Sequence, residues 1–265
     1  MKKPSFGLRL LNAYVKWSLK RYTRSIEIVN PPPSHEDRSV IYASTHQNTL
    51  LDPLLIIPYL PNIPYSLTRG DVFKSGWIEN FLFSVRMRPV FRIRDGFSTV
   101  REQGLNAFSN LNPQLLDNED VLFFAEANND IQPQLRPIKK GVVRIAENCP
   151  KEKPPIVYAL RISWSHPVYS FPKARLEFSD PIEYQSFDEL PKTIYNTMDS
   201  MSFLPFDVQR DSSRSWVEYL TLRLGMKREF TGLIRWCLWF VALPSLLILS
   251  LLISAFITIL TVIFI

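Results

Sequence analysis

Short apolar runs alternate along this chain with longer segments of mixed polarity. Runs rich in β-branched and aromatic residues between turn residues are typical of strands, whereas longer segments with apolar positions on one side are typical of helices. The runs predict strands at residues 40–44, 65–68, 89–93, 121–126, 156–163 and 174–178. The longer segments predict helices at 53–58, 72–85, 98–111, 139–148, 187–201 and 213–224. This alternation indicates an α/β fold with a mostly parallel sheet flanked by helices.

The C-terminal part of the chain is its longest apolar segment. No charged residue occurs from Trp236 to Ile265, and residues 246–265 are almost entirely apolar. That stretch reaches the ~20 residues that a membrane-spanning helix needs. Four cations precede it, namely Arg223, Lys227, Arg228 and Arg235. By the positive-inside rule they place the preceding domain on the cytoplasmic face of the cell membrane. A buried helix of a soluble core is the alternative, which the uninterrupted length disfavours.

Residues 8–24 predict an amphipathic helix at the other end. Its apolar side comprises Leu8, Leu11, Val15, Leu19 and Tyr22. Its polar side comprises Arg9, Lys16, Lys20 and Arg24, and no acidic residue is present. Such a helix lies at a membrane interface, where its cations meet anionic head groups. Nucleic acid would also attract a basic helix, but the apolar C-terminus favours lipid. We therefore expect a membrane-interface helix in 1–25, a folded domain in 26–230 and a transmembrane segment in 231–265.

Composition narrows the function further. At 265 residues and 46% hydrophobic content, the chain can bury one substantial core. Its net charge is +6, and its two cysteines, Cys149 and Cys237, lack the spacing of a disulfide framework or a zinc site. No glycine-rich phosphate loop or dinucleotide fingerprint is present, which argues against nucleotide-driven chemistry. We expect no metal, no cofactor and no nucleic-acid partner.

The candidate chemistry lies where the first predicted strand ends. His46 follows that strand, and Asp52 precedes Pro53 at the predicted start of a helix. An Asp before a Pro is a good helix start, because the carboxylate accepts from free backbone N–H groups and Pro loses no bond there. The same two side chains could act together, with His46 removing a proton from a hydroxyl and Asp52 orienting the imidazole. A solvated histidine and a simple helix cap are the alternative interpretation.

Later segments favour the chemical interpretation. After TLLDP at 49–53 come RPVFRIRD at 88–95, FFAEA at 123–127, LRPIKKG at 135–141 and PIVYA at 155–159. In this order the segments resemble the sequence blocks of the 1-acyl-glycerol-3-phosphate acyltransferases, also called glycerolipid or lysophospholipid acyltransferases. The resemblance covers roughly residues 39–164, and LRPIKKG is similar to a pattern of bacterial members. It implies the same α/β architecture and an acyltransferase catalytic domain in 26–230.

The sequence departs from the family pattern in three respects. Five residues separate His46 from Asp52, whereas four are most often found, although some bacterial relatives have a longer spacing. In the third block, Ala125 and Ala127 stand where Pro and Gly are usual, which removes a rigid turn and a permissive backbone position. Asn128-Asn129-Asp130 follows where an Arg often assists with phosphate. These changes bear on the acceptor more than on the reaction.

The resemblance assigns His46 and Asp52 as catalytic residues. Substrate binding is predicted for Arg92, Arg94, Glu126, Arg136, Lys139 and Lys140. Arg92 is the leading phosphate ligand, because a cation at the end of a buried strand is costly unless an anion meets it. Glu126 ends a buried strand, where a role in binding acceptor hydroxyls or in holding the basic groups is expected.

The expected function is membrane-bound O-acyl transfer. The acyl donor would be acyl-CoA or acyl carrier protein, and the acceptor a hydroxyl of a lysophospholipid such as 1-acyl-glycerol-3-phosphate, in phospholipid biosynthesis. Membrane lipids and the acyl carrier are the expected partners. Two alternatives remain: an acyltransferase for a phosphate-poor acceptor such as an aminolipid, and a catalytically inactive lipid-binding relative.

Overall fold

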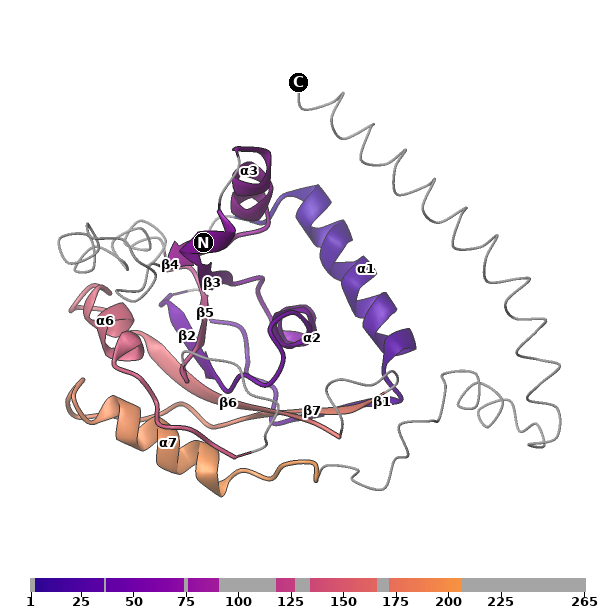
Figure 1. The fold of residues 1–265 in the computed structure, drawn as a ribbon. Coiled ribbons are helices and arrows are strands. Elements are labelled where there is room, and N and C mark those ends of the chain that lie inside the picture. The colour runs from indigo at the N-terminus through magenta and orange to yellow at the C-terminus, as the bar shows by residue number, and fades with distance from the viewer. Residues whose placement is uncertain are drawn as a thin grey trace, which may run out of the picture. The chain divides into compact units, whose positions relative to one another are not determined.

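Seven strands form one sheet in the part of the chain that the computed structural model describes, residues 3–35, 37–73, 76–90, 118–126, 134–165 and 172–205. All of these residues belong to one compact unit, Met1–Asp207. The strands are β1 Ser25–Val29, β2 Val40–Ser44, β3 Tyr65–Arg69, β4 Met87–Val90, β5 Val121–Phe124, β6 Ile156–Trp164 and β7 Lys173–Phe178. Their order across the sheet is β1-β7-β6-β2-β5-β3-β4 (Figure 1).

The sheet is mostly parallel, as the sequence predicted. Antiparallel pairing occurs between β6 and β7, and every other neighbouring pair is parallel. All six predicted strands are confirmed where the structure describes them, and the sequence missed β1. That strand is half exposed at the edge of the sheet, so it lacks the continuous apolar run that marks the central strands.

Helices lie on both faces of the sheet. The described α-helices are α1 Phe6–Tyr22, α2 Leu51–Ile56, α3 Gly76–Ser84, α6 Gly141–Glu147 and α7 Leu190–Ser200, with short 3-10 turns η1 Ile57–Tyr59 and η2 Gly70–Val72. They confirm five of the predicted helices, including 8–24, although the helix predicted at 72–85 begins later and is preceded by η2. The predicted helices 98–111 and 213–224 and the transmembrane segment 231–265 lie outside the described residues.

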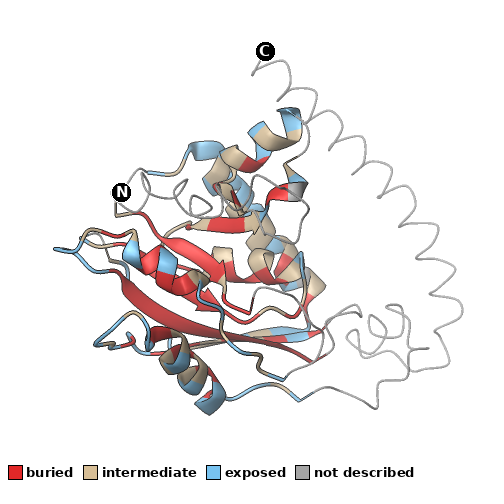
Figure 2. Ribbon diagram, turned by 60° about the vertical axis from the view of Figure 1, so that its left-hand side comes forward, coloured by how far each residue is buried: buried red, intermediate tan, exposed pale blue. Residues whose placement is uncertain are grey.

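Two hydrophobic clusters fill the space between helices and sheet. One joins the β2, β5 and β6 side chains that face α6 and α7, among them Ile41 and Val157. The other joins the opposite side chains to α1 and α2, among them Tyr42 and Leu160. Period-two alternation sends neighbouring strand residues to opposite clusters, which explains why β2 is buried at all five positions. Figure 2 shows this burial concentrated in the central strands.

Helix α1 is amphipathic, but the apolar side that the sequence assigned to lipid packs against the protein. Leu19 is buried, and Val15 packs on the same cluster as α2 and the sheet. A second apolar stripe, on the outer side of α1, is exposed. The sequence pattern did not distinguish these two stripes, because helical spacing alone does not tell which side meets the core.

None of the helices within the described ranges is long and apolar enough to cross a membrane.

Candidate active site

The candidate site lies in the turn that follows β2, at the carboxyl end of a central strand, where open α/β sheets bind ligands. Strand β6 extends beyond β2, and the turn is tied to this extension by side chains. Thr45 Oγ1 accepts from the N–H of Ile162 at 2.9 Å, and Gln47 Oε1 accepts from the N–H of Trp164 at 3.1 Å. These bonds fix the backbone on both sides of His46.

Helix α2 begins immediately after this turn. Asn48 Oδ1 accepts from the N–H groups of Leu50 and Leu51 at 3.1 and 3.0 Å, so Asn48 supports the helix start. The sequence prediction that Asp52 caps the helix and that Pro53 occupies its first position is wrong. The helix begins at Leu51, and the Asp52 side chain turns back toward the loop.

The contact predicted between His46 and Asp52 is confirmed. His46 Nδ1 lies 2.9 Å from Asp52 Oδ2, so the longer spacing between them is accommodated within the turn. Hydrogen bonding of Nδ1 to a carboxylate places the imidazole proton on Nδ1, which leaves Nε2 as the basic nitrogen. The His46 side chain is 13% exposed, and its ring stacks on Phe124 with centroids 4.0 Å apart.

Asp52 is fully buried and accepts from several donors. Its Oδ2 also accepts from the N–H groups of Gln47 and Asn48 at 2.7 and 2.8 Å. Its Oδ1 accepts from Nε1 of Trp164 at 2.7 Å. A buried charge is tolerated only when it is hydrogen-bonded in this way. The carboxylate is therefore held in one orientation, from which it fixes the His46 ring.

Glu126 connects the turn after β2 to a third segment. Its Oε2 accepts from the N–H of His46 and from Nη2 of Arg136, each at 2.9 Å, and its Oε1 accepts from the N–H of Arg136 at 2.9 Å. The same Nη2 donates to the His46 carbonyl oxygen at 3.0 Å. Of the two roles expected for Glu126, the structure shows it holding a basic group.

Four other residues were predicted to bind substrate, namely Lys139, Lys140, Arg92 and Arg94. Lys139 and Lys140 are exposed just before α6, although the N–H of Lys139 donates to the carbonyl oxygen of Ala125 at 2.9 Å. Arg92 and Arg94 lie outside the described residues. The structure therefore brings together His46, Asp52, Glu126 and Arg136 of the predicted set.

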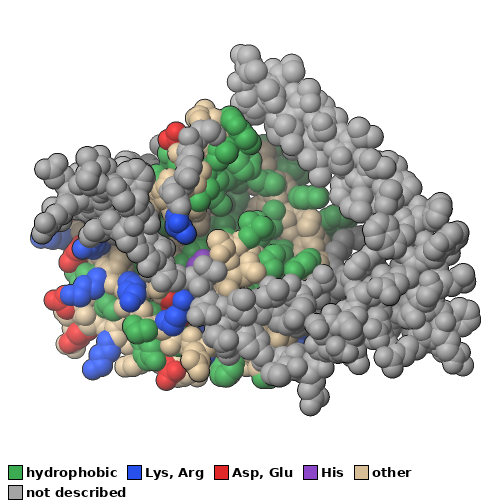
Figure 3. Space-filling model, viewed as in Figure 1, with side chains coloured by type: hydrophobic (Ala, Val, Ile, Leu, Met, Phe, Trp, Pro, Cys, Tyr) green, Lys and Arg blue, Asp and Glu red, His purple; other side chains and the backbone are tan. Residues whose placement is uncertain are grey.

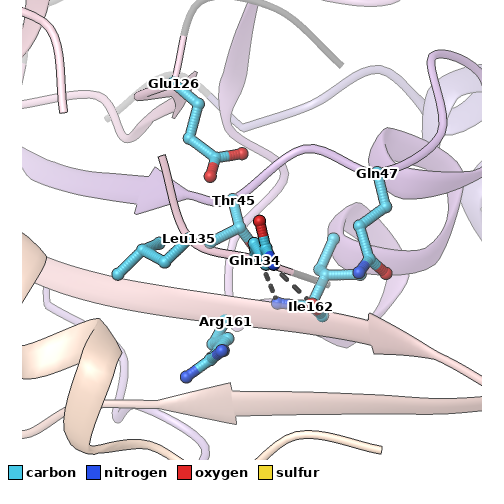
Figure 4. Close-up of a pocket in the computed structure, with 7 residues that line it drawn as sticks. All are labelled: Thr45, Gln47, Glu126, Gln134, Leu135, Arg161 and Ile162. Atoms are coloured by element: carbon cyan, nitrogen blue, oxygen red, sulfur yellow. Dashed lines mark hydrogen bonds between the residues drawn. The ribbon is translucent and has the colours of Figure 1, made fainter. Parts of the chain in front are cut away.

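A small polar cavity lies below the turn. It is lined by Thr45, Gln47, Glu126, Gln134, Leu135, Arg161 and Ile162 (Figure 4). Arg161 was not predicted as part of the site. Its Nη1 donates to the carbonyl oxygens of Met198 and Met201 at 2.8 and 2.9 Å, and burial lowers the pKa of this guanidinium. Arg161 thus ties the end of α7 to β6, the strand that supports the turn after β2.

Sequence reasoning also missed Trp164 and Phe124, the side chains that contact Asp52 and His46. In the sequence both are apolar residues of predicted buried strands, and no neighbouring motif identifies either one as part of a site.

Cys149 does not offer an alternative nucleophile, because burial raises the pKa of its thiol to about 12. Within the described ranges, no group of three His, Cys, Asp or Glu residues could hold a metal ion.

A histidine oriented by a buried carboxylate at the end of a central parallel strand is an arrangement suited to general-base chemistry. The sequence model of the family described as Acyltransferase matches residues 25–162, just over half of the chain. The chain therefore belongs to this family and is an acyltransferase.

Comparison with solved structures supports the α/β fold described above. The crystal structure of the 1-acyl-sn-glycerophosphate acyltransferase PlsC from Thermotoga maritima matches with a TM-score of 0.53 and 15% sequence identity. The match covers 78% of this chain and 81% of that one. At this identity the match establishes the α/β fold alone. No significant match was found among curated proteins.

Proposed function

We propose that this protein is a membrane-bound O-acyltransferase of phospholipid biosynthesis. It would move a fatty acyl group from acyl-CoA or acyl carrier protein to a hydroxyl of a lysophospholipid such as 1-acyl-glycerol-3-phosphate. The His46–Asp52 contact carries this proposal, because it supplies an oriented base in a chain of the acyltransferase family. The PlsC-like fold supports a lipid acceptor.

In the proposed reaction, Nε2 of His46 takes the proton of the acceptor hydroxyl as that oxygen attacks the thioester carbonyl carbon. Asp52 stabilises the imidazolium that forms. The tetrahedral intermediate collapses with breakage of the carbon–sulfur bond, and His46 returns the proton to the departing thiolate. The products are an ester and a free thiol, and no cofactor takes part.

Membrane attachment is part of the proposal. The apolar segment 231–265 and the basic helix α1 would hold the catalytic domain on the cytoplasmic face of the cell membrane. An enzyme held there could receive its apolar acceptor from the bilayer rather than through water. Membrane lipids and the acyl carrier are the proposed partners.

A phosphate-poor acceptor, such as an aminolipid, is the second candidate. Arg136 is engaged by Glu126 and by the His46 carbonyl oxygen, and no cation occurs between Ala127 and Asp130. Phosphate binding would then rest on Arg92, Arg94, Lys139 and Lys140. An acceptor without phosphate would not need these cations.

Thiol release from an acyl thioester tests the proposal, with purified full-length protein and a panel of lipid acceptors. We expect a lysophospholipid to stimulate release and His46→Ala to abolish the stimulation. His35→Ala is the matched control, because His35 contacts Tyr158 away from the turn and its loss should leave release unchanged. If no acceptor stimulates release above the His46→Ala level, the protein is an inactive relative. Activity on lipids without phosphate that Arg92→Ala does not diminish would favour the second candidate.

A further inference from the structure

The large hydrophobic side chains that are exposed in the described ranges are concentrated on one part of the surface. Nine of the ten lie on α1, α3 or the short segments before α2 and α3, and Phe203 is the exception. The nine are Phe6, Leu10, Leu11, Tyr14, Trp17, Leu50, Val72, Trp77 and Phe81. Figure 1 shows α1, α2 and α3 on the same side of the sheet. An exposed apolar concentration of this kind marks an interaction surface.

The outer stripe of α1 contributes the largest number of these exposed hydrophobic side chains. Phe6, Leu10, Tyr14 and Trp17 are spaced by four, four and three residues, which places them on one side of the helix. Their exposed fractions are 74%, 54%, 50% and 52%. Burial of Leu19 on the inner side already secures the helix to the protein. The outer stripe is therefore not required for packing of the fold.

Helix α3 carries a second pair at helical spacing. Trp77 is 76% exposed and Phe81, four residues later, is 54% exposed. The helix is secured elsewhere, because Leu82 is buried and the rings of Phe83 and Phe73 lie 5.4 Å apart. As in α1, one side of α3 packs while an aromatic side faces outward.

Leu50 presents an apolar side chain beside the catalytic turn. It is 67% exposed and lies four residues after His46. Its backbone is fixed, because its N–H donates to Asn48 Oδ1 at 3.1 Å. Figure 3 shows hydrophobic side chains gathered around a hollow on the face that α1, α2 and α3 cover.

We propose that these side chains form one lipid-docking face, in which α3 and Leu50 enter an anionic bilayer surface together with the outer stripe of α1. We define this face by Phe6, Leu10, Tyr14, Trp17, Leu50, Trp77 and Phe81. The inference rests on the proposed function and adds α3 as a second contact element. Docking through both helices sets the catalytic turn at the bilayer surface, with Leu50 next to the lipid acceptor.

Charge and residue type favour a bilayer over a protein partner. Helix α1 contains Arg9, Lys16, Lys20 and Arg21 but no acidic residue, which suits an anionic lipid surface. Lys16 is engaged over the Tyr59 ring at 4.6 Å, whereas Arg9 and Lys20 are exposed. Trp and Tyr, with an apolar body and a polar tip, are enriched at membrane interfaces. Trp17, Tyr14 and Trp77 fit that location.

Tryptophan fluorescence tests the docking of α3 with full-length protein in vesicles that contain phosphatidylglycerol. Vesicles with brominated acyl chains quench only side chains that reach the bilayer. We expect Trp77→Phe to remove part of the bromine-quenched emission. Trp164→Phe is the matched control, because it removes a fully buried indole whose emission bromine should not affect. If Trp77 emission is the same with brominated and plain lipid, α3 does not enter the bilayer and the proposal is wrong.

An activity comparison separates docking from catalysis. We expect Trp77→Ser/Phe81→Ser to lower acyl transfer to a lysophospholipid in vesicles by on the order of tenfold, because two buried aromatic contacts are lost. Transfer to the same acceptor dispersed as detergent micelles should not change. Equal loss in vesicles and micelles would contradict the docking role. If the wild type transfers no acyl group in vesicles or in micelles, the proposed function is overturned. The bromine quenching of Trp77 would still show whether α3 enters the bilayer.

Discussion

Nε1 of Trp164 donates a 2.7 Å hydrogen bond to Oδ1 of Asp52, and both side chains are fully buried. The bond joins the end of β6 to the first turn of α2. It occupies the carboxylate oxygen that does not contact His46, so it orients Asp52 from the side opposite the base. We therefore expect Trp164 to be a positioning residue for the proposed catalytic pair, His46 and Asp52.

Trp164→Phe should lower kcat by about tenfold, because Asp52 loses a hydrogen bond to a charged group, typically worth about 1.5–3 kcal/mol. KM for the acceptor should change little, since the indole lies behind the carboxylate. Steady-state thiol release measures both constants, and denaturant unfolding measures the loss of stability. Phe178→Leu is the matched control, since it removes buried aromatic packing from the same cluster without touching Asp52. An equal loss of kcat in both variants would contradict the positioning role.

Glu126→Gln should lower kcat by about tenfold to a hundredfold while KM for the acceptor stays within about twofold. The change removes the charge that pairs with the partly exposed Arg136, and a hydrogen bond to a charged group is typically worth about 1.5–3 kcal/mol. The catalytic turn then loses one of its supports, because Glu126 also accepts from the His46 N–H. A large rise in KM with kcat preserved would instead support acceptor binding by Glu126.

Glu119→Gln offers the matched control for that measurement. Glu119 is equally buried and pairs with Arg86 at 2.9 Å, but it lies before β5 rather than after it. Because β2 and β5 are parallel, Glu119 lies at the amino ends of these strands, whereas His46 lies at their carboxyl ends. We expect a comparable loss of stability by denaturant unfolding and an unchanged kcat.

The sheet was predictable from sequence because its central strands are buried on both faces. Val40–Ala43 is a run of β-branched, aromatic and small apolar residues, and the predicted bounds of this strand, 40–44, agree with the structure. The half-exposed β1 lacked this signal. Helix α1 was predicted in type but not in orientation, because Leu10 and Trp17 are as apolar as Leu8 and Val15, and only tertiary packing separates the two sides.

The contact of the proposed catalytic pair was predictable because His46 and Asp52 are only six residues apart in the sequence. Glu126 and Arg136 were each identified as candidates, but their contact was not, since it depends on the path of the chain between them. The contact of Trp164 with Asp52 spans 112 residues. Such contacts follow from the register of β2 on β6, which no local pattern specifies.

Gly141→Ala should destabilise the fold by about 1–3 kcal/mol, the usual cost of overpacking. A Cβ atom at Gly141 would lie 2.6 Å from Cζ of Phe123, which is packed in the core beneath α6. This clash should outweigh the roughly 1 kcal/mol that Ala normally contributes over Gly in a helix. Gly76→Ala is the matched control, because Gly76 begins α3 and has nothing within 4 Å of the added atom. If both variants gain stability in thermal unfolding, the close packing on Phe123 is wrong.

Asp120 is a buried carboxylate at the amino end of β5. Burial raises its pKa from 3.8 to about 7, while hydrogen bonds from Asn62 and the Val40 backbone lower it, nearby Glu119 raises it and Arg86 lowers it. Its Oδ1 is buried and has no hydrogen-bond partner within the described ranges. An amide in place of the carboxyl therefore keeps the Asn62 contact through its oxygen.

Asp120→Asn should remove a pH dependence of stability. Because the folded-state pKa is raised, the folded protein retains this proton while the unfolded chain releases it, so wild-type stability falls as pH rises from about 4 to about 7 and then levels off. The difference in pKa corresponds to at most about 4 kcal/mol. In urea unfolding at pH 5, 6, 7 and 8, the free energy of unfolding of the variant should rise relative to that of the wild type as pH increases. Acyl transfer should not change, because Asp120 lies at the amino ends of the parallel strands and His46 lies at their carboxyl ends. A constant difference between the two proteins at all four pH values would contradict the raised pKa.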